Sequence, residues 1–176
     1  SIRAYTAKKL TDTEIKTLIT AGLQAPTARN MQEVHFSVVS GDNPVLLEID
    51  KECKLKYIGK SMDNTVKQTI DGFPNNFYYN APTVLILSAD KNFKWSKFDA
   101  GIATANMTLA AQSMGLGSLI IGIIDDAMRG EKNDYFAKAL QFPDNYEFAI
   151  AVAIGHRDTE KEPHEIDFDK SVSIIL

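Results

Sequence analysis

Several short clusters of polar and glycine residues have the composition of a binding site for a small molecule. The first cluster is residues 1–5 (SIRAY), in which Arg3 stands close to the Ser1 hydroxyl. A guanidinium group binds phosphate oxygens bidentately, so this pair suits a phosphate. A surface arginine without a ligand would give the same pattern, and the cluster alone does not decide between the two.

Two further clusters suit a flat heterocycle. Residues 25–32 (APTARNMQ) lie between a predicted helix and a predicted strand, and amide side chains there can hydrogen-bond the polar edge of a ring. Residues 115–122 (GLGSLIIG) contain glycines that let the backbone approach a flat ligand closely. The alternatives that need no ligand are a turn-rich loop and a helix end followed by a core strand.

Other catalytic and metal-binding signatures are absent. The chain has no P-loop, no dinucleotide-binding glycine motif, no zinc-protease motif and no serine-hydrolase elbow. Its three histidines, at positions 35, 156 and 164, are scattered and predict no zinc site. A neighbouring lysine would lower the pKa of the single cysteine, Cys53, but no histidine is close in sequence, and we expect no catalytic thiol.

The composition excludes several classes of protein. The 176 residues predict one domain, and 44% hydrophobic with 24% charged residues is ordinary for a globular chain. The net charge is −4 and no lysine–arginine cluster appears, so nucleic acid is not an expected partner. No membrane span or signal peptide is visible, and one cysteine without a disulfide partner fits a cytoplasmic location.

Helices and strands alternate along the chain, which predicts a mixed α/β or α+β domain. A capping box at Thr11 and Glu14 starts a helix that stops at Pro26. Further helices are expected from Pro44, over 98–114 and over 133–140, with a surface helix over 60–71 and a loop over 71–76. Strands are expected over 34–40, 83–88, 118–124 and 148–154, the last stopped by Gly155.

The apolar end of the chain needs a partner. Residues 172–176 (VSIIL) follow a polar stretch, and exposing them would be costly. We expect them to pair as an edge strand, either in the chain's own sheet or in that of a partner.

Read together and in order, these clusters resemble the nitroreductase family of FMN enzymes. Residues 1–5 resemble the end of the family's R-x-S-x-R-x-[FY], and residues 25–32 resemble A-P-[ST]-x-x-N-x-Q. Residues 80–84 (NAPTV) are similar to the mid-chain strand entry. Residues 99–122 resemble D-x-G-x-A-x-x-N-x-x-L-A-A-x-x-x-G-L-G-S-x-x-x-G, and residues 154–156 resemble the strand end before the terminal arm.

The resemblance implies an α+β fold, a three-layer sandwich whose mainly antiparallel central sheet is flanked by helices. It implies a single domain over 1–176 whose terminal arm, residues 156–176, embraces the partner subunit of a homodimer. Two FMN molecules would lie at the interface. NAD(P)H would reduce the flavin, and a small electron-poor acceptor such as a nitroaromatic or a quinone would reoxidise it in ping-pong turnover, with no side chain acting as acid or base.

The resemblance also implies site residues. Ser1 and Arg3 would hold the phosphate and ribityl chain, and the backbone around Ile120, Ile121 and Gly122 would face the isoalloxazine. The loop of the other subunit would reach the flavin through a set of neighbouring residues: Pro26, Thr27, Ala28, Asn30 and Gln32. The candidates in the arm for a phosphate contact are Arg157, Lys161 and His164.

The chain departs from the family pattern at several points. The family's first arginine has no counterpart in these residues, and N-x-Q is followed by Glu33-Val34 instead of Pro-Trp. The usual basic pair of the arm is replaced by residues 163–165 (PHE). Residues 53–77 match no family pattern, and we expect them to cover the substrate side. Two other functions remain open: a specialised relative, such as a reductive dehalogenase or a flavin-fragmenting enzyme, and a non-catalytic flavin-binding module.

Overall fold

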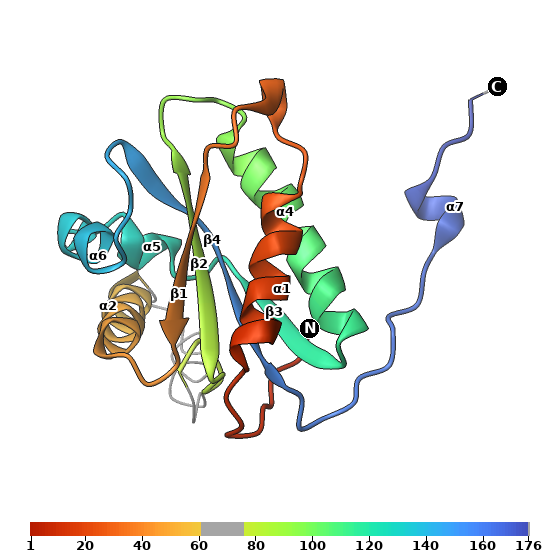
Figure 1. Cartoon of the computed structure of the whole chain (residues 1–176), viewed down its shortest axis with the longest axis horizontal. Helices are drawn as coiled ribbons and strands as arrows, with labels where there is room; N and C mark the ends of the chain where they lie inside the picture. Colours follow the sequence, from red (N-terminus) through yellow and green to blue (C-terminus); the bar gives the residue numbers. More distant parts are fainter. Residues whose placement is uncertain (61–75, 176) are drawn as a thin grey trace.

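The centre of the molecule is a four-stranded sheet with the order β1-β2-β4-β3 (Figure 1). The structure is a computed structural model that describes residues 1–60 and 76–175. The strands are β1 (Val34–Ser40), β2 (Thr83–Asp90), β3 (Leu116–Ile121) and β4 (Tyr146–His156). All neighbouring strands pair antiparallel. The predicted α+β fold with an antiparallel central sheet is confirmed.

One face of the sheet is covered by α1 (Asp12–Leu23) and α4 (Ser96–Ser113) (Figure 1). The predicted capping box starts α1: the Thr11 hydroxyl accepts from the Glu14 N–H, and the Glu14 carboxylate accepts from the Thr11 N–H at 2.7 Å. Small residues let the helices approach the sheet, since a Cβ at Gly22 would lie 2.8 Å from the Phe36 ring. The core of this layer includes Leu18, Leu85, Leu87, Met107 and Val152.

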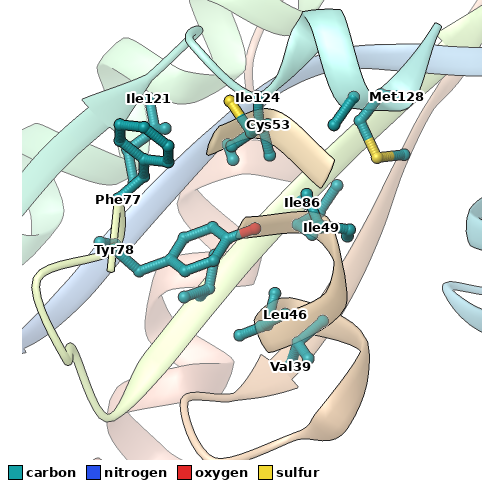
Figure 2. Close-up of a cluster of buried hydrophobic side chains, with 14 of the residues drawn as sticks. Val39, Leu46, Ile49, Cys53, Phe77, Tyr78, Ile86, Ile121, Ile124 and Met128 are labelled. Atoms are coloured by element: carbon teal, nitrogen blue, oxygen red, sulfur yellow. The ribbon is translucent and has the colours of Figure 1, made fainter. Parts of the chain in front are cut away.

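The other face is covered by α2 (Pro44–Lys60), α5 (Asp125–Met128) and α6 (Asn133–Ala139). Their apolar side chains meet those of the sheet in a second core (Figure 2). Val84 and Ile86 of β2 belong to this core, whereas Leu85 and Leu87 belong to the first, because successive strand residues point to opposite faces. The three predicted layers follow from this alternation.

Cys53 lies inside the second core (Figure 2). Its thiol is fully buried and donates a hydrogen bond to the Ile123 carbonyl at 3.3 Å. Burial raises its pKa to about 12, and the charges of Asp50 and Asp126 act in the same direction. Lys54 and Lys56 lower this pKa, as expected of a neighbouring lysine, but the loss of water outweighs their charges and the net shift is upward.

Several predicted strand boundaries are wrong. β4 runs through Gly155 instead of stopping there, because the glycine serves close packing: a Cβ would lie 2.6 Å from the Pro82 ring. β3 starts at Leu116, directly after Gly115 has ended α4 with a φ of 71°. It stops at Ile121, and the following residues turn into α5 instead of extending the strand to Ile124.

The end of the chain makes no strand with its own sheet. After β4 the arm runs away from the body through α7 (Phe168–Ser171), and residues 172–175 are exposed (Figure 1). Pairing within its own sheet is thus excluded for the described part of the tail. The surface helix expected over 60–71 and the loop expected over 71–76 lie almost wholly outside the described residues. None of the helices described is long and apolar enough to cross a membrane.

Candidate functional site

A cleft of about 470 Å³ opens between the N-terminal segment, the end of α4 and the terminal arm. Its lining brings together predicted site residues from the two ends of the chain: Ser1, Arg157, Lys161 and His164. The cleft thus combines a hydroxyl with guanidinium, ammonium and imidazole groups, a set of donors that suits an anion. Glu162 also lines it, and Glu160 approaches the Arg157 guanidinium at 3.4 Å, so the positive charge is partly balanced.

The N-terminal segment is held in place beside β3. The Ile2 N–H donates to the Ser118 carbonyl at 2.9 Å, and Tyr5 forms a β-bridge with Arg157. Gly117 makes this contact possible, because a Cβ there would lie 2.8 Å from the Ile2 side chain. The segment therefore fixes Ser1 at the mouth of the cleft and occupies part of the outer edge of β3.

Arg3 does not line this cleft. Its guanidinium carbon lies 5.8 Å from the centre of the Tyr79 ring, at cation–π distance. The structure thus does not bring the Arg3 guanidinium to the cleft that Ser1 lines, although the resemblance assigns both residues to one phosphate and ribityl chain. A direct contact between Arg3 and the phosphate stays a prediction.

Residues 27–32 form a tight loop around the 3-10 turn η1 (Ala28–Asn30). Arg29, Asn30 and Gln32 have positive φ values of 56°, 54° and 55°, in the left-handed region that disfavours residues other than glycine. The Thr27 hydroxyl accepts the Gln32 N–H at 3.0 Å and closes the loop. Such backbone strain persists only where the surroundings impose it, and it is frequent at ligand-binding loops.

The side chains of this loop face outward. Asn30 and Gln32 are exposed, and the Gln32 side-chain amide donates to the side-chain oxygen Oδ1 of Asn30 at a long 3.4 Å. Pro26 is exposed at the entry of the loop, and Thr27 and Ala28 are partly buried. The two amides are therefore placed to hydrogen-bond a molecule that approaches from outside the chain.

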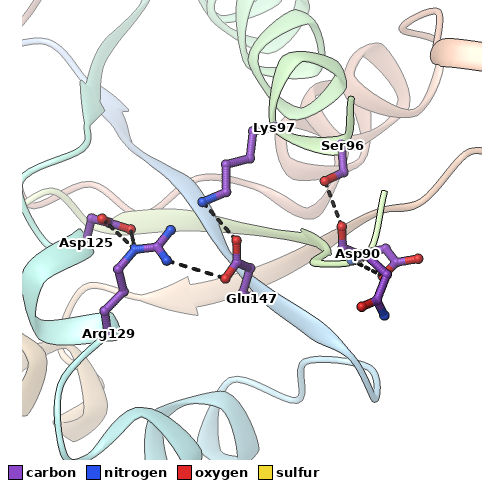
Figure 3. Close-up of polar contacts among 7 residues, drawn as sticks. Asp90, Ser96, Lys97, Asp125, Arg129 and Glu147 are labelled. Atoms are coloured by element: carbon purple, nitrogen blue, oxygen red, sulfur yellow. Dashed lines mark hydrogen bonds and ion pairs between the residues drawn. The ribbon is translucent and has the colours of Figure 1, made fainter. Parts of the chain in front are cut away.

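Asp99, near the start of α4, forms a hydrogen bond with the loop. The Asp99 carboxylate is buried and accepts the Ala28 N–H at 2.9 Å. Figure 3 shows how this end of the helix is tied to the sheet: the Ser96 hydroxyl donates to the Asp90 carbonyl at 2.8 Å, and Lys97 pairs with Glu147 of β4 at 2.9 Å. A fixed helix end gives the loop a fixed hydrogen-bond acceptor.

The end of β3 offers an open stretch of backbone. Ile120 is 48% exposed while Ile121 is buried, as expected from the alternation of a strand. Gly122 is exposed, and a Cβ there would meet no atom of the described residues within 4 Å. Packing within the chain thus does not require a glycine at this position, and the space beside it is accessible to a ligand.

The loop and the cleft lie far apart in one chain. Figure 1 shows the loop, in orange, at one end of the α1–α4 layer and the N-terminus at the other. Asp99 near the start of α4 supports the loop, whereas Gln112 near its end lines the cleft. The rise of about 1.5 Å per helical residue separates these two positions by about 20 Å. The loop and the cleft of one chain therefore lie at opposite ends of α4.

Comparison with known proteins assigns the chain to a family. The model of the "Nitroreductase family" matches residues 1–156, which include the N-terminal segment, the loop and all four strands. The chain belongs to the nitroreductase family.

Relatives of this nitroreductase chain agree with the assignment. A "Putative NADH dehydrogenase/NAD(P)H nitroreductase" of Archaeoglobus fulgidus is 29% identical over 95% of this chain and 86% of its own length. A nitroreductase structure with bound FMN from Desulfitobacterium hafniense has a TM-score of 0.88 at 26% identity, covering 100% of this chain and 93% of the other. One from Bacteroides fragilis, also with bound FMN, has a TM-score of 0.85 at 25% identity, covering 100% and 94%.

Sequence reasoning missed several residues of this nitroreductase. Ile2, Gln112 and Ser118 line the cleft together with the arm. Ser118 belongs to the motif of residues 115–122, so its place in the cleft could have been predicted from that motif. No feature of the sequence singles out Gln112. The buried neighbours Asp99 and Glu33 were also not singled out as supports of the loop. In the part of the chain that the structure describes, no group of His, Cys, Asp or Glu residues is placed to hold a metal ion.

Proposed function

We propose that this chain is an FMN-dependent oxidoreductase that passes electrons from NAD(P)H to small electron-poor acceptors, such as nitroaromatics or quinones, by a ping-pong mechanism. The observation that carries the proposal is the pairing of an anion-binding cleft with a separate, strained loop that presents amides. FMN has a matching pair of ends, a phosphate and a polar ring edge. Family membership and the FMN-bound relatives support the same cofactor.

The cleft fits the phosphate end of FMN. Its volume of about 470 Å³ falls within the range of about 300–1,000 Å³ that is usual for ligand pockets. Arg157, Lys161 and His164 would bind the phosphate, with Ser1 adding a hydroxyl and Arg3 reaching the ribityl chain or phosphate after leaving Tyr79. We infer no site for an adenosine group, and therefore FMN instead of FAD.

The loop and the end of β3 fit the ring end. Asn30 and Gln32 would hydrogen-bond the polar edge of the flavin, supported by the backbone of Thr27 and Ala28 and by the ring of Pro26. The backbone of Ile120, Ile121 and Gly122 would lie against the ring of the flavin held by its own subunit. When bound, FMN supplies the redox chemistry. The side chains of this chain bind and orient the ring, and none of them needs to take up or release a proton.

The proposed site requires a homodimer, and the surface of α4 supports one. Phe98, Ile102 and Leu109 form an apolar stripe along the helix and are all exposed. Their spacings of four and seven residues place them on one face. Such a stripe on a soluble chain marks an interface. A second copy laid across it would bring the loop of one subunit toward the cleft of the other.

The tail would extend this interface. Ile174 is 71% exposed in the isolated chain. Because Ile2 occupies part of the β3 edge, the open edge of the described sheet is β1. A groove of about 260 Å³ runs along β1 beside the end of α6. We infer that residues 172–176 pair with this edge in the partner subunit. The buried single cysteine also fits a reducing compartment such as the cytoplasm.

The visible spectrum of the purified protein tests the cofactor directly. Flavin absorption bands and a heat-released chromophore that co-migrates with FMN are expected. Released FAD, or no flavin after incubation with FMN, would refute the proposal. Oxidation of NADH and NADPH with and without a nitroaromatic or quinone then separates the proposed oxidoreductase from a non-catalytic flavin-binding module, and parallel double-reciprocal plots are expected for ping-pong turnover.

A further inference from the structure

Glu33 is a buried acid, and no other residue that the structure describes donates a hydrogen bond to it. It stands between the loop 27–32 and β1, is 6% exposed, and neither of its carboxyl oxygens receives a hydrogen bond from another described residue. A carboxylate in this position would lose hydration without a neighbouring donor to compensate for it. Such a group takes up a proton instead, provided that an acceptor stands nearby to receive it.

A second buried acid lies close to Glu33. The Asp99 carboxyl lies within hydrogen-bonding reach of Glu33 and is itself 3% exposed. Asp99 accepts the Ala28 N–H at 2.9 Å, so it already receives a hydrogen bond from the loop, whereas Glu33 does not. Two buried carboxyl groups in contact can share one proton, but they cannot both be ionised without strong repulsion.

The surroundings of the pair favour the neutral form of Glu33. Burial raises the pKa of Glu33, and the hydrogen bond and charge of Asp99 raise it further against the opposing effect of its own backbone N–H. The charge of Asp90, at the end of β2, acts in the same direction as that of Asp99. Tyr146 of β4 also faces the group, and the Lys97 ammonium is engaged by Glu147 at 2.9 Å (Figure 3).

We propose that Glu33 is a positioning residue for the FMN-binding loop: its protonated carboxyl donates a hydrogen bond to Asp99, and Asp99 in turn holds the Ala28 N–H. This chain of hydrogen bonds fixes the left-handed backbone that presents Asn30 to the flavin. The inference rests on the proposed function, in that the loop must contact FMN. It also assigns a role to the position at which this chain has glutamate instead of the family's proline.

The sign of the pH dependence follows from the raised pKa. The hydrogen bond is fully present below the ordinary pKa of a glutamate and is lost as the pH rises through the raised value. Above that value two carboxylates face each other, Asp99 turns from the loop, and the Ala28 N–H loses its acceptor. FMN affinity should therefore fall as the pH rises through the raised pKa of Glu33, by about tenfold for one lost charge-assisted hydrogen bond.

The test compares the wild type with Glu33→Gln, which keeps a donor but cannot ionise. FMN dissociation constants are measured by flavin fluorescence from mildly acidic to alkaline pH. We expect a fall in wild-type affinity that Glu33→Gln does not show. The exposed residue Glu131 provides the control Glu131→Gln, which should keep the wild-type profile. The titration of the FMN phosphate affects all three proteins equally. Identical pH profiles for wild type and Glu33→Gln would overturn the proposal.

Two measurements on the flavin-free protein separate this inference from the proposed function. The pKa read from the carboxyl ¹³C signal that disappears in Glu33→Gln should lie above the ordinary range of a glutamate. Protection of the Ala28 N–H from hydrogen exchange should fall as that signal titrates. A Glu33 carboxyl that titrates in the ordinary glutamate range, or Ala28 N–H protection that does not change as Glu33 titrates, would refute the positioning role. Failure of every variant to bind FMN would instead refute the proposed function, and these two measurements would still decide the role of Glu33.

Discussion

The loop 27–32 and the terminal arm are proposed to hold the same FMN, yet they are built in opposite ways. The loop is fixed by its own chain: Thr27 and Asp99 accept the N–H groups of Gln32 and Ala28. The arm beyond Arg157 is exposed at every described residue, and its hydrogen bonds beyond Asp158 are local, such as the Asp167 cap of α7. The loop is thus preorganised, whereas the arm has to obtain its order from the partner and the cofactor.

This difference predicts which mutations should weaken FMN binding and the dimer most. A preorganised element loses only the contact that a mutation removes, because its ordering cost is already met within the chain. An element ordered by assembly loses its contact and the assembly together. Changes in the arm that disturb the dimer should therefore exceed changes at single loop residues.

Deletion of residues 172–176 should have the largest effect. Burial of an isoleucine or valine side chain stabilises by about 1.5–3 kcal/mol, and the deletion removes several such residues. The dimer dissociation constant should rise by at least about a hundredfold and flavin occupancy should fall with it. Excess FMN should partly restore the dimer by mass action. Light scattering and flavin absorbance on one sample provide both readings. Ser173→Ala is the control, and a truncated protein that stays dimeric with full flavin content would show that the tail assignment is wrong.

Leu109→Asp should weaken the dimer next most strongly. Leu109 is 69% exposed in the single chain and lies on the apolar stripe of α4, so a buried charge would oppose association. Leu47 of α2 is 53% exposed on the opposite layer, and Leu47→Asp is the matched control. Analytical ultracentrifugation should show that the dimer dissociation constant rises by about tenfold or more for Leu109→Asp and does not change for Leu47→Asp. Equal behaviour of the two variants would contradict the placement of the interface.

Asn30 tests the preorganised loop. Asn30→Ala should weaken FMN binding by about tenfold to a hundredfold, since one buried hydrogen bond of about 1–3 kcal/mol is lost. Alanine also strains a backbone whose φ is 54°, so Asn30→Gly is the sharper variant, because it removes the same amide and tolerates that angle. Fluorescence titration should show the loss in both variants. Wild-type affinity in the glycine variant would mean that the side chain does not contact FMN.

Arg157→Gln should have the smallest effect of these. Its side chain is one-third exposed and already lies 3.4 Å from Glu160, so the contact with phosphate is worth only about 1 kcal/mol, or about fivefold in affinity. The loss should appear with FMN and not with riboflavin, which lacks the phosphate. Calorimetric titration with both ligands provides its own control, and an equal loss with riboflavin would remove Arg157 from the phosphate site.

Local signals predicted the elements of this fold. The capping box at Thr11, the bounds of β1 and the end of α4 at Gly115 are each decided by neighbours in sequence, and the structure confirms them. Gly155 was wrongly predicted to end its strand, because its role depends on a tertiary contact. A strand glycine that makes room for Pro82 looks in sequence like one that ends the strand.

The residues proposed to contact FMN could be predicted from the sequence, but the residues that hold them in place could not. The residues proposed for the phosphate and the ring stand in motifs, and the structure brings Ser1 and the arm cations to one cleft. The Arg3 guanidinium instead lies over the Tyr79 ring, a contact that the spacing in the sequence does not reveal. The bond from Ala28 to Asp99 joins residues 71 positions apart, and the burial of Glu33 depends on the same packing.

A mixed dimer tests most directly whether the site is shared between subunits. One subunit carries Asn30→Gly, and the other carries glutamine in place of the arm cations at positions 157, 161 and 164, with different tags for purification. If the loop of one subunit and the arm of the other build each site, the mixed dimer contains one doubly damaged site and one intact site. Half of its sites should then bind FMN with wild-type affinity, although neither parent homodimer has such a site. A mixed dimer in which no site regains wild-type affinity would contradict the shared site.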